Sequence, residues 1–292
     1  MSSRDLPMTD DDDTAPAAEP AKPGTDWWAE IKGILWLVLA VLGIHSFIAK
    51  PFYIPSESMM PGLLEGDRLV VSKYPFGWSW VSASFHVLPE MEGRLFGRLP
   101  ERGDVVIVTP PGQSSDYIKR VIGLPGDTIE LIGGQLIING EPVRREVRPP
   151  RMLPMDPNLT CDGLLAPFRI TGADGKGYCR VPVVRETLPN GRSYDTIDIG
   201  ATRGDDFPAT RIPENHVFLM GDNRDQSSDS RFELSEQGLG GPVPWENIGG
   251  RAEFITFSLD GTSQYWNPIS WFTALRGGRA GTSLRPDEAP AK

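Results

Sequence analysis

The first strong pattern in the chain is a long apolar run from Ile34 to Ala49. Among its 16 positions only His45 and Ser46 are polar. Folded as an α-helix at ~1.5 Å per residue, the run is roughly 24 Å long, a little less than the hydrocarbon core of a bilayer. We therefore predict a transmembrane anchor helix over residues 33–49.

The residues beside this run favour a membrane anchor over two other interpretations. A buried core helix is the first alternative, and a cleaved signal peptide is the second. The second is disfavoured because the preceding segment is acidic and Phe47 is too large for the −3 position of a cut after Ala49. Lysine and aromatic side chains suited to a membrane interface lie on both sides of the run: Trp27, Trp28, Lys32, Lys50, Phe52 and Tyr53.

Short runs of β-branched and aromatic residues, bounded by Gly or Pro, follow the anchor. They comprise residues 104–109 (DVVIVT), 116–122 (DYIKRVI) and 216–220 (HVFLM). Residues 128–132 and 135–139 flank Gly133-Gly134, a pattern typical of a hairpin with a two-residue turn. The fold is therefore predicted to be mainly β.

Changes in composition along the chain predict its organisation. An acidic N-terminal segment without hydrophobic periodicity is predicted to be disordered. A Pro- and Arg-rich stretch with weak periodicity is predicted to be an insertion between two halves of a β core. The predicted segments are the tail 1–32, the anchor 33–49, the core parts 50–140 and 212–279, the inserted subdomain 141–211 and a C-terminal tail 280–292.

Composition excludes some classes of function. A net charge of −10 argues against a nucleic-acid partner, since phosphate contacts need a basic surface. With three histidines and two cysteines, the chain has no recognisable zinc-binding spacing. Cys161 and Cys179 are 18 positions apart in a turn-rich stretch. They are either unconnected buried thiols or a disulfide, and the disulfide is favoured if this part of the chain is exported.

A serine-containing segment lies a few residues beyond the anchor. It reads IPSESMMPGL from Ile54 to Leu63, and Pro55 and Pro61 stiffen the backbone around Ser56 and Ser58. A nucleophile needs its reacting atom held in place beside a free backbone amide, which a stiff loop provides. The alternative is a linker, where serines beside prolines are common.

A lysine-containing segment reads DYIKRVIGLPGD from Asp116 to Asp127. On a strand, Tyr117, Lys119 and Val121 project from one face. A lysine held among apolar and aromatic groups loses solvation, which lowers its pKa and lets the neutral amine act as a general base. The alternative is a solvent-exposed strand lysine.

A third segment, GDNRDQSSDSR, extends from Gly221 to Arg231 directly after an apolar run. Its arginines and aspartates can form charge-assisted pairs that hold a loop in place, and Ser227 can then orient a base. A polar surface turn is the alternative. Arg102-Gly103-Asp104, by contrast, is interpreted as a structural turn that leads into a strand.

Together these segments resemble the bacterial type I signal peptidases, the Ser/Lys proteases that mature exported proteins. The family's motifs PSxSMxPTL, YxKRxxGxPGD and GDNRDxSxDSR correspond to PSESMMPGL, YIKRVIGLPGD and GDNRDQSSDSR, in the same order and after an anchor. The resemblance covers roughly residues 33–260 and is thin through 141–211. It departs from the family at Gly62, where Thr is usual, and at Gln226, where Asn is frequent.

The resemblance implies a role for each matching residue. Ser58 corresponds to the nucleophile and Lys119 to the general base, with the Ser56 hydroxyl and the Ser58 N–H forming the oxyanion hole. Ser227 corresponds to the hydroxyl that orients the lysine, Asp229 and Arg231 brace its loop, and Tyr117 is a substrate-pocket candidate.

The resemblance also implies a fold, a substrate and a location. The fold is an antiparallel β-sheet catalytic core with a smaller β-rich subdomain. The substrates are the signal peptides of preproteins, cut after small residues at −1 and −3, with no metal or organic cofactor. The enzyme is expected to cross the inner (plasma) membrane once, with its catalytic domain on the periplasmic or extracytoplasmic side.

Three other functions compete with this interpretation. A metallophosphoesterase needs many His and Asp ligands, which three scattered histidines cannot supply. A membrane-tethered β scaffold that binds exported proteins would need neither Ser58 nor Lys119. A soluble self-cleaving repressor also uses a Ser/Lys pair, but it would not carry an anchor beside its serine.

Aromatic residues predict a second contact with the lipid bilayer. Trp78 and Trp80 share a face if their segment is extended, and tryptophan favours the lipid interface. The alternative is that these side chains fill the core. The aromatic residues concerned are Phe76, Trp78, Trp80, Phe85 and Phe96, together with Trp266 and Trp271 near the C-terminus.

Overall fold

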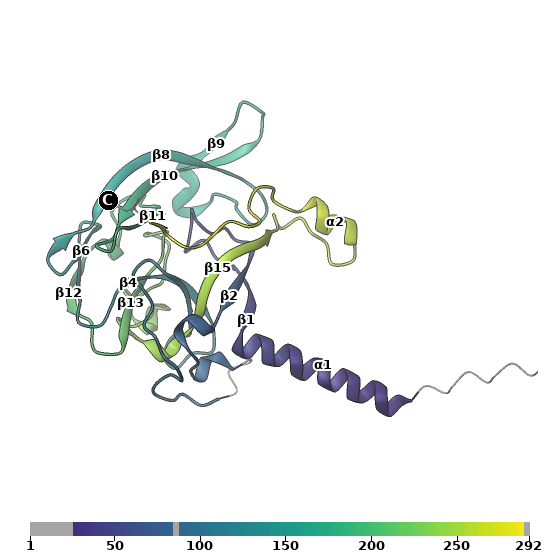
Figure 1. Ribbon diagram of the computed structural model, residues 1–292. Coiled ribbons are helices and arrows are strands. Elements are labelled where there is room, and N and C mark those ends of the chain that lie inside the picture. Colours follow the sequence, from purple (N-terminus) through teal and green to yellow (C-terminus); the bar gives the residue numbers. More distant parts are fainter. Residues whose placement is uncertain (1–25, 84–87, 289–292) are drawn as a thin grey trace, which may run out of the picture. The chain divides into compact units, whose positions relative to one another are not determined.

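The computed structural model describes residues 26–83 and 88–288 of the chain (Figure 1). The predicted disordered segment before residue 26, Phe85 and the last four residues lie outside this range. The chain divides into two units, residues 1–39 and residues 40–292.

The apolar run forms helix α1, which extends from Trp27 to Phe47. It begins six residues earlier than predicted, because the Asp26 carboxylate caps it by accepting hydrogen bonds from the Trp28 and Ala29 amides at 3.1 and 3.3 Å. Residues 27–32 are therefore helical and do not belong to the tail. The helix of 21 residues is about 31 Å long and apolar enough to cross a bilayer.

The predicted fold class is confirmed, because the rest of the described chain is mainly antiparallel β. The central sheet has seven strands in the order β1-β2-β15-β3-β4-β13-β14. Its strands are β1 (Ala49–Tyr53), β2 (Asp67–Ser72), β3 (Val105–Val108), β4 (Tyr117–Gly123), β13 (His216–Met220), β14 (Val243–Pro244) and β15 (Ile248–Ser258). Strand β4 lies in the interior of this sheet, between β3 and β13.

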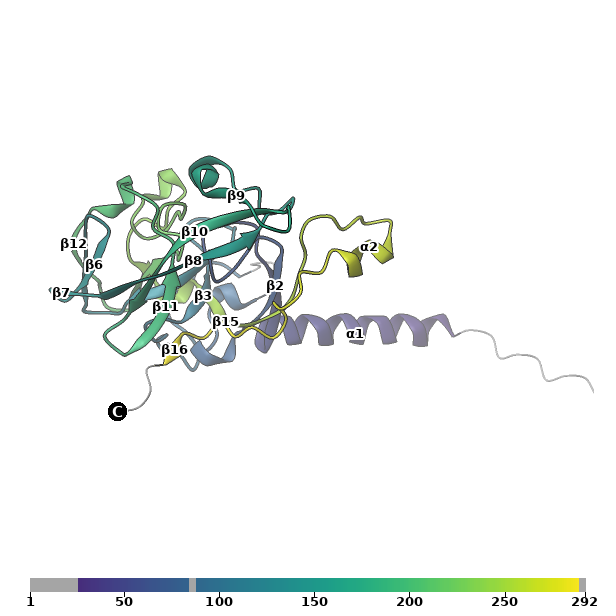
Figure 2. The same ribbon diagram turned by 90° about the horizontal axis from the view of Figure 1, so that it is seen from above.

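Two smaller sheets contain the remaining strands. A five-stranded sheet pairs β8 (Arg144–Pro154), β9 (Arg169–Thr171), β10 (Gly177–Thr187), β11 (Arg192–Thr196) and β16 (Asp287–Glu288). A four-stranded sheet pairs β5 (Thr128–Ile132), β6 (Gln135–Ile138), β7 (Glu141–Pro142) and β12 (Phe207–Arg211). In Figures 1 and 2, β8 and β10 run side by side as a long curved pair. The predicted hairpin is β5–β6, with Gly133 and Gly134 both at positive φ.

The helices after α1 are short. Helix α2 (Pro268–Thr273) is the second α-helix of the described chain. The 3₁₀ helices are η1 (Tyr74–Phe76), η2 (Trp80–Ser82), η4 (Gly163–Phe168), η5 (Arg203–Asp205), η6 (Leu234–Glu236) and η7 (Trp245–Asn247).

The C-terminal segment is not a loose tail up to residue 288. Leu284 is buried in the core beside β15, and its amide donates to the Glu253 carbonyl at 2.9 Å. Strand β16 then pairs with Arg192 and Ser193 of β11. Because these contacts join residues far apart in sequence, the local composition did not predict them.

The prediction that Trp78 and Trp80 share an exposed face is wrong. The segment turns through η1 and η2 and is not extended, so alternation does not apply to it. Trp80 is only 5% exposed, and Trp78 is half-buried with its indole N–H donating to the Phe47 carbonyl at 2.9 Å. In contrast, Trp266 is 89% exposed and Trp271 is also exposed. Their loop and helix α2 stand apart from the sheets in both views (Figures 1 and 2).

Candidate active site

The serine segment forms a tight loop between β1 and β2. Ile54 anchors both ends of the loop, because its amide donates to the Asp67 carbonyl and its carbonyl accepts from the Gly66 amide, each at 3.0 Å. Met59 and Leu63 are almost fully buried and linked by a backbone hydrogen bond of 2.9 Å. These contacts hold Ser58 within a hydrogen-bonded turn whose apolar side chains are buried.

Lys119 lies directly opposite the serine, on the interior strand β4. Its Nζ atom lies 3.0 Å from Ser58 Oγ and 3.0 Å from the Ile118 carbonyl oxygen. Ser58 Oγ is in turn 3.3 Å from Ser56 Oγ. The Lys119 residue is 3% exposed and Ser58 is 6% exposed, so this contact is nearly closed to solvent.

Burial determines the electrostatics of this lysine. It lowers the pKa of Lys119 from 10.5 to about 8, because the ammonium loses its solvation, while the carboxylates of Asp229 and Asp222 act in the opposite direction. The Tyr117 ring lies 5.5 Å from Nζ. A lysine in this setting is neutral in a substantial fraction of molecules slightly above neutral pH.

The third segment forms a loop that contacts the serine loop through its backbone. The Asn223 amide donates to the Ser58 carbonyl at 3.1 Å, and its side chain donates to the Glu57 carbonyl at 3.1 Å. Gly221 makes this approach feasible, because a Cβ there would lie 2.5 Å from the Ser58 carbonyl oxygen and 2.1 Å from Ser227 Oγ. No larger residue fits at position 221 without moving one of the two loops.

Asp229 and Arg231 lie together inside this loop. The Asp229 carboxylate accepts from the Gly221 amide at 2.9 Å and from Arg231 Nε at 2.9 Å. Burial alone would raise the pKa of Asp229, but the Arg231 guanidinium holds it below its usual value. The Asp229 carboxylate and the Arg231 guanidinium thus form an ion pair inside the loop.

The structure does not place Ser227 in a hydrogen bond with the lysine. Its hydroxyl is buried and has no hydrogen-bond partner within the described part of the chain. The side chain packs closely against the backbone of Gly221. Its predicted orienting role thus receives no support from a hydrogen bond here.

A cavity of about 490 Å³ lies behind the serine loop, and a second one of about 340 Å³ opens onto Ser58. The second cavity is lined by Ser56, Ser58, Tyr117 and Lys119 among others. Within the described residues the Ser58 amide makes no hydrogen bond. No group of three or more His, Cys, Asp or Glu in residues 26–83 and 88–288 is arranged to hold a metal ion.

At the two departures from the family motifs, space does not require glycine at position 62, and Gln226 makes a hydrogen bond. A Cβ at Gly62 would meet the Met59 carbonyl oxygen and Asp222 Oδ2 at 3.6 and 3.7 Å, which is ordinary contact. Gln226 lines the smaller cavity and accepts a hydrogen bond of 3.1 Å from Asn223 Nδ2.

Cys161 and Cys179 are joined by a disulfide with their Cα atoms 5.7 Å apart. Both residues are fully buried in a core cluster beneath β8 and β10. The bond therefore ties the segment before η4 to β10, within the five-stranded sheet, and does not contact the serine or the lysine.

Sequence reasoning missed several residues that support the site. Arg120, the neighbour of Lys119, binds both carboxylate oxygens of Asp222 at 2.7 and 2.6 Å. Glu186 of β10 binds Arg224 in the same bidentate way, at 2.9 and 2.5 Å. The sequence placed Asp222 and Arg224 in charge-assisted pairs within their own segment, but the structure pairs each with a residue 102 or 38 positions away, which no local pattern identifies.

Comparisons with known proteins agree on one family. A family model described as "Signal peptidase, peptidase S26" matches residues 27–257. A protein named signal peptidase I from Rickettsia typhi is 38% identical over 239 residues, which is 78% of this chain and 80% of that protein. A protein of the same name from Rickettsia bellii is 36% identical over 238 residues, 78% of this chain and 73% of that protein.

A solved structure was also found, the crystal structure of a signal peptidase I from Enterococcus faecalis. It is 22% identical, with a TM-score of 0.26, and the match covers 53% of this chain and 97% of that one.

Proposed function

The chain belongs to the signal peptidase family, peptidase S26, and from this membership we propose that it removes signal peptides by means of a Ser58–Lys119 dyad. A serine peptidase activity follows from the family, and the dyad is our assignment of its machinery. The observation that carries the assignment is the contact of 3.0 Å between Lys119 Nζ and Ser58 Oγ in a nearly closed site.

The proposed reaction is acyl transfer to Ser58. Neutral Lys119 takes the Ser58 proton while Ser58 Oγ attacks the scissile carbonyl carbon. The Ser58 amide and the Ser56 hydroxyl donate to the oxyanion as it forms. The Lys119 ammonium then gives its proton to the leaving amine. Neutral Lys119 next activates a water molecule, which releases the acyl group from Ser58.

The smaller cavity supports an extended peptide as the substrate. It continues from Ser58 along β4 to Tyr117 and Asp116, so a peptide beside β4 would place alternate side chains toward its wall. We propose that residues −1 and −3 point into this wall and must therefore be small. The matching substrates are the signal peptides of preproteins.

The proposed location is the inner (plasma) membrane, with α1 as a single span and the catalytic domain on the periplasmic or extracytoplasmic side. The length and composition of α1 support the span. The Cys161–Cys179 disulfide supports an oxidising compartment for the domain, since such bonds are rare in the cytosol.

The function is tested with purified protein in detergent and a precursor that carries an Ala-x-Ala site. We expect a single cut after the second Ala, identified by N-terminal sequencing of the mature product. A precursor with Phe at −1 serves as the control and should remain whole. Equal cutting of both precursors, or none of either, would contradict the proposal.

We further propose that the α2 loop lies in the lipid interface, in place of the Trp78–Trp80 surface. The loop carries a group of exposed aromatic side chains: Tyr265, Trp266, Trp271 and Phe272, with Ile269 beside them. Asn267 caps α2 by accepting from the Ile269 amide at 3.2 Å, so a defined turn presents this group. Aromatic side chains at such a turn favour the boundary between lipid and water.

To test this surface, the quenching of tryptophan fluorescence by brominated lipid is measured in proteoliposomes of the full chain. The quenched fraction is expected to fall when the tryptophans of the α2 loop are replaced. Replacing Trp266 and Trp271 by Phe removes two of the eight tryptophans, which should be among those that the lipid quenches. Trp80→Phe is the matched control, because Trp80 is buried in the domain and should contribute unquenched fluorescence. If the quenched fraction is the same in both variants, the loop does not contact lipid.

A further inference from the structure

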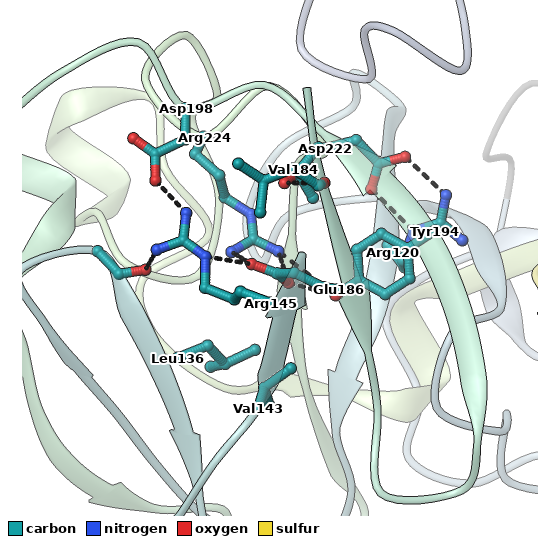
Figure 3. Close-up of polar contacts among 12 residues, drawn as sticks. Arg120, Leu136, Val143, Arg145, Val184, Glu186, Tyr194, Asp198, Asp222 and Arg224 are labelled. Carbon is teal, nitrogen blue, oxygen red and sulfur yellow. Dashed lines mark hydrogen bonds and ion pairs between the residues drawn. The ribbon is translucent and has the colours of Figure 1, made fainter. Parts of the chain in front are cut away.

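A buried ionic cluster joins the five-stranded sheet to the loop that carries Asp229 (Figure 3). At its centre is Glu186 of β10, which is 0% exposed. Its two carboxylate oxygens accept from Nη1 and Nη2 of Arg224 at 2.9 and 2.5 Å. The Tyr194 hydroxyl of β11 donates to the same carboxylate at 2.9 Å.

A second arginine reaches Glu186 from β8. Arg145 Nε lies 3.9 Å from a Glu186 oxygen, and the same guanidinium pairs with Asp198 and donates to the Gly134 carbonyl at 3.3 Å. Figure 3 shows Arg145 and Arg224 approaching Glu186 together, with Leu136 and Val143 close by. The Glu186 carboxylate is thus contacted by Arg145 of β8 and Tyr194 of β11, both in its own sheet, and by Arg224 of the loop.

Tyr194 connects this cluster to the strand of Lys119. The Arg120 guanidinium stacks over the Tyr194 ring at 4.3 Å from its centre and binds Asp222 with two hydrogen bonds. Asp222 precedes Asn223, whose amide holds the Ser58 carbonyl. Arg120 is also the residue next to Lys119 on β4.

Arg224 is itself tied into the backbone of the loop. Its Nε donates to the Gly221 carbonyl at 3.2 Å, and its own carbonyl accepts from Arg231 at 2.7 Å. Its amide donates to the Ile197 carbonyl at 2.9 Å, just beyond β11. Movement of Arg224 would therefore move Gly221, where a Cβ would lie 2.5 Å from the Ser58 carbonyl oxygen, and Asn223, whose amide donates to that oxygen.

We propose that Glu186 is a positioning residue for the reaction at Ser58. Its carboxylate fixes the Arg224 guanidinium, and Arg224 in turn fixes the loop of residues 221–231. The loop is thereby held in the position at which the Asn223 amide reaches the Ser58 carbonyl and the Asp229 carboxylate lies near Lys119. The inserted segment thereby sets the geometry of an active site to which it contributes no reacting group. This inference rests on the proposed function.

A bidentate pair between a carboxylate and a guanidinium specifies direction as well as distance, which an apolar contact does not. A buried ion pair adds little net stability over apolar residues of similar volume, but removing one partner leaves an unbalanced charge. The two roles of Glu186, balancing charge and positioning the loop, can therefore be separated by comparing single and double replacements.

The test compares the single variant E186Q with the double variant E186M/R224M, each as the full chain in detergent with a precursor of the Ala-x-Ala type. We expect kcat to fall about 10²-fold in each folded variant with KM changed much less, since small misplacements of reacting groups have effects of this size. The double variant should recover part of the thermal unfolding midpoint that E186Q loses, because it removes the unbalanced Arg224 charge but leaves Arg145 and the Tyr194 hydroxyl without the Glu186 carboxylate. It should not recover kcat, and its rate–pH curve should shift, because the carboxylates near Lys119 move.

E146Q is the matched control, because Glu146 also lies in the five-stranded sheet but pairs with Arg144 at the surface. It should keep the kcat of the unaltered chain. If E186M/R224M recovered both kcat and the unfolding midpoint, the proposal would be overturned. Glu186 would then serve only to balance the charge of Arg224. A folded E186Q with unaltered kcat would overturn it too, and if E186Q does not fold, the double variant decides. An unaltered chain that folds but does not cleave would instead contradict the proposed function.

Discussion

Ser58→Ala is expected to abolish cleavage of the precursor while the protein still folds. The hydroxyl at position 58 is the proposed nucleophile, and it is the group that Lys119 contacts at 3.0 Å. Removing the nucleophile of a serine protease costs at least ~10⁴-fold in kcat. The Ser58 backbone groups remain, so the hydrogen bond from the Asn223 amide to the carbonyl should persist.

The measurement is the single-turnover rate of cleavage with enzyme in excess. Ser235→Ala is a suitable control, because Ser235 lies in the exposed helix η6 and has no contact with the cavity. The control should cleave at the rate of the unaltered chain. If Ser58→Ala retains even a hundredth of that rate, the nucleophile has been misassigned.

The rate of cleavage is also expected to rise about tenfold per pH unit at low pH and to level off near the Lys119 pKa of about 8. This follows because only the neutral amine can accept the Ser58 proton. Lys119→Ala and Lys119→Arg should both be inactive, since a guanidinium does not lose its proton in this range. The measurement is kcat/KM against pH.

Lys73 provides the control for the pH prediction. Burial also lowers the pKa of Lys73 to about 8, yet its amine bonds the Ser82 carbonyl and does not contact Ser58. If Lys119 is the base, kcat/KM of Lys73→Met should rise with pH over the same range as that of the unaltered chain. The assignment would be contradicted if kcat/KM of Lys73→Met no longer rose with pH. It would also be contradicted if the rise in the unaltered chain levelled off only near 10.5, the pKa of an ordinary lysine.

The same pKa shift has a consequence for stability with a defined sign. The folded pKa of Lys119 is about 8 and the unperturbed value is 10.5, so the unfolded chain binds more protons between these pH values. The contribution of Lys119 to the free energy of unfolding therefore rises from about pH 8 to 10.5 and is least favourable below pH 8.

The sequence by itself determined the features that depend on neighbouring residues. The apolar run of α1, the two-residue hairpin turn after Ile132 and the short β strands are local patterns of period or of glycine conformation. The family was identifiable for a related reason, because its motifs are contiguous stretches. The proposed roles of Ser58 and Lys119 came from those stretches. The two residues are 61 positions apart in the sequence, and in the structure Lys119 Nζ lies 3.0 Å from Ser58 Oγ.

Other features depended on which distant segments pack together, and only the tertiary structure decided them. Trp80 is buried because its segment turns through two 3₁₀ helices, whereas Trp266 is exposed on a loop of similar composition. Glu186 looks like an ordinary strand glutamate until β10 places it against Arg224. The chain pairs such residues only when its sheets assemble, and the free energy of burying their charges depends on that assembly and not on their neighbours in sequence.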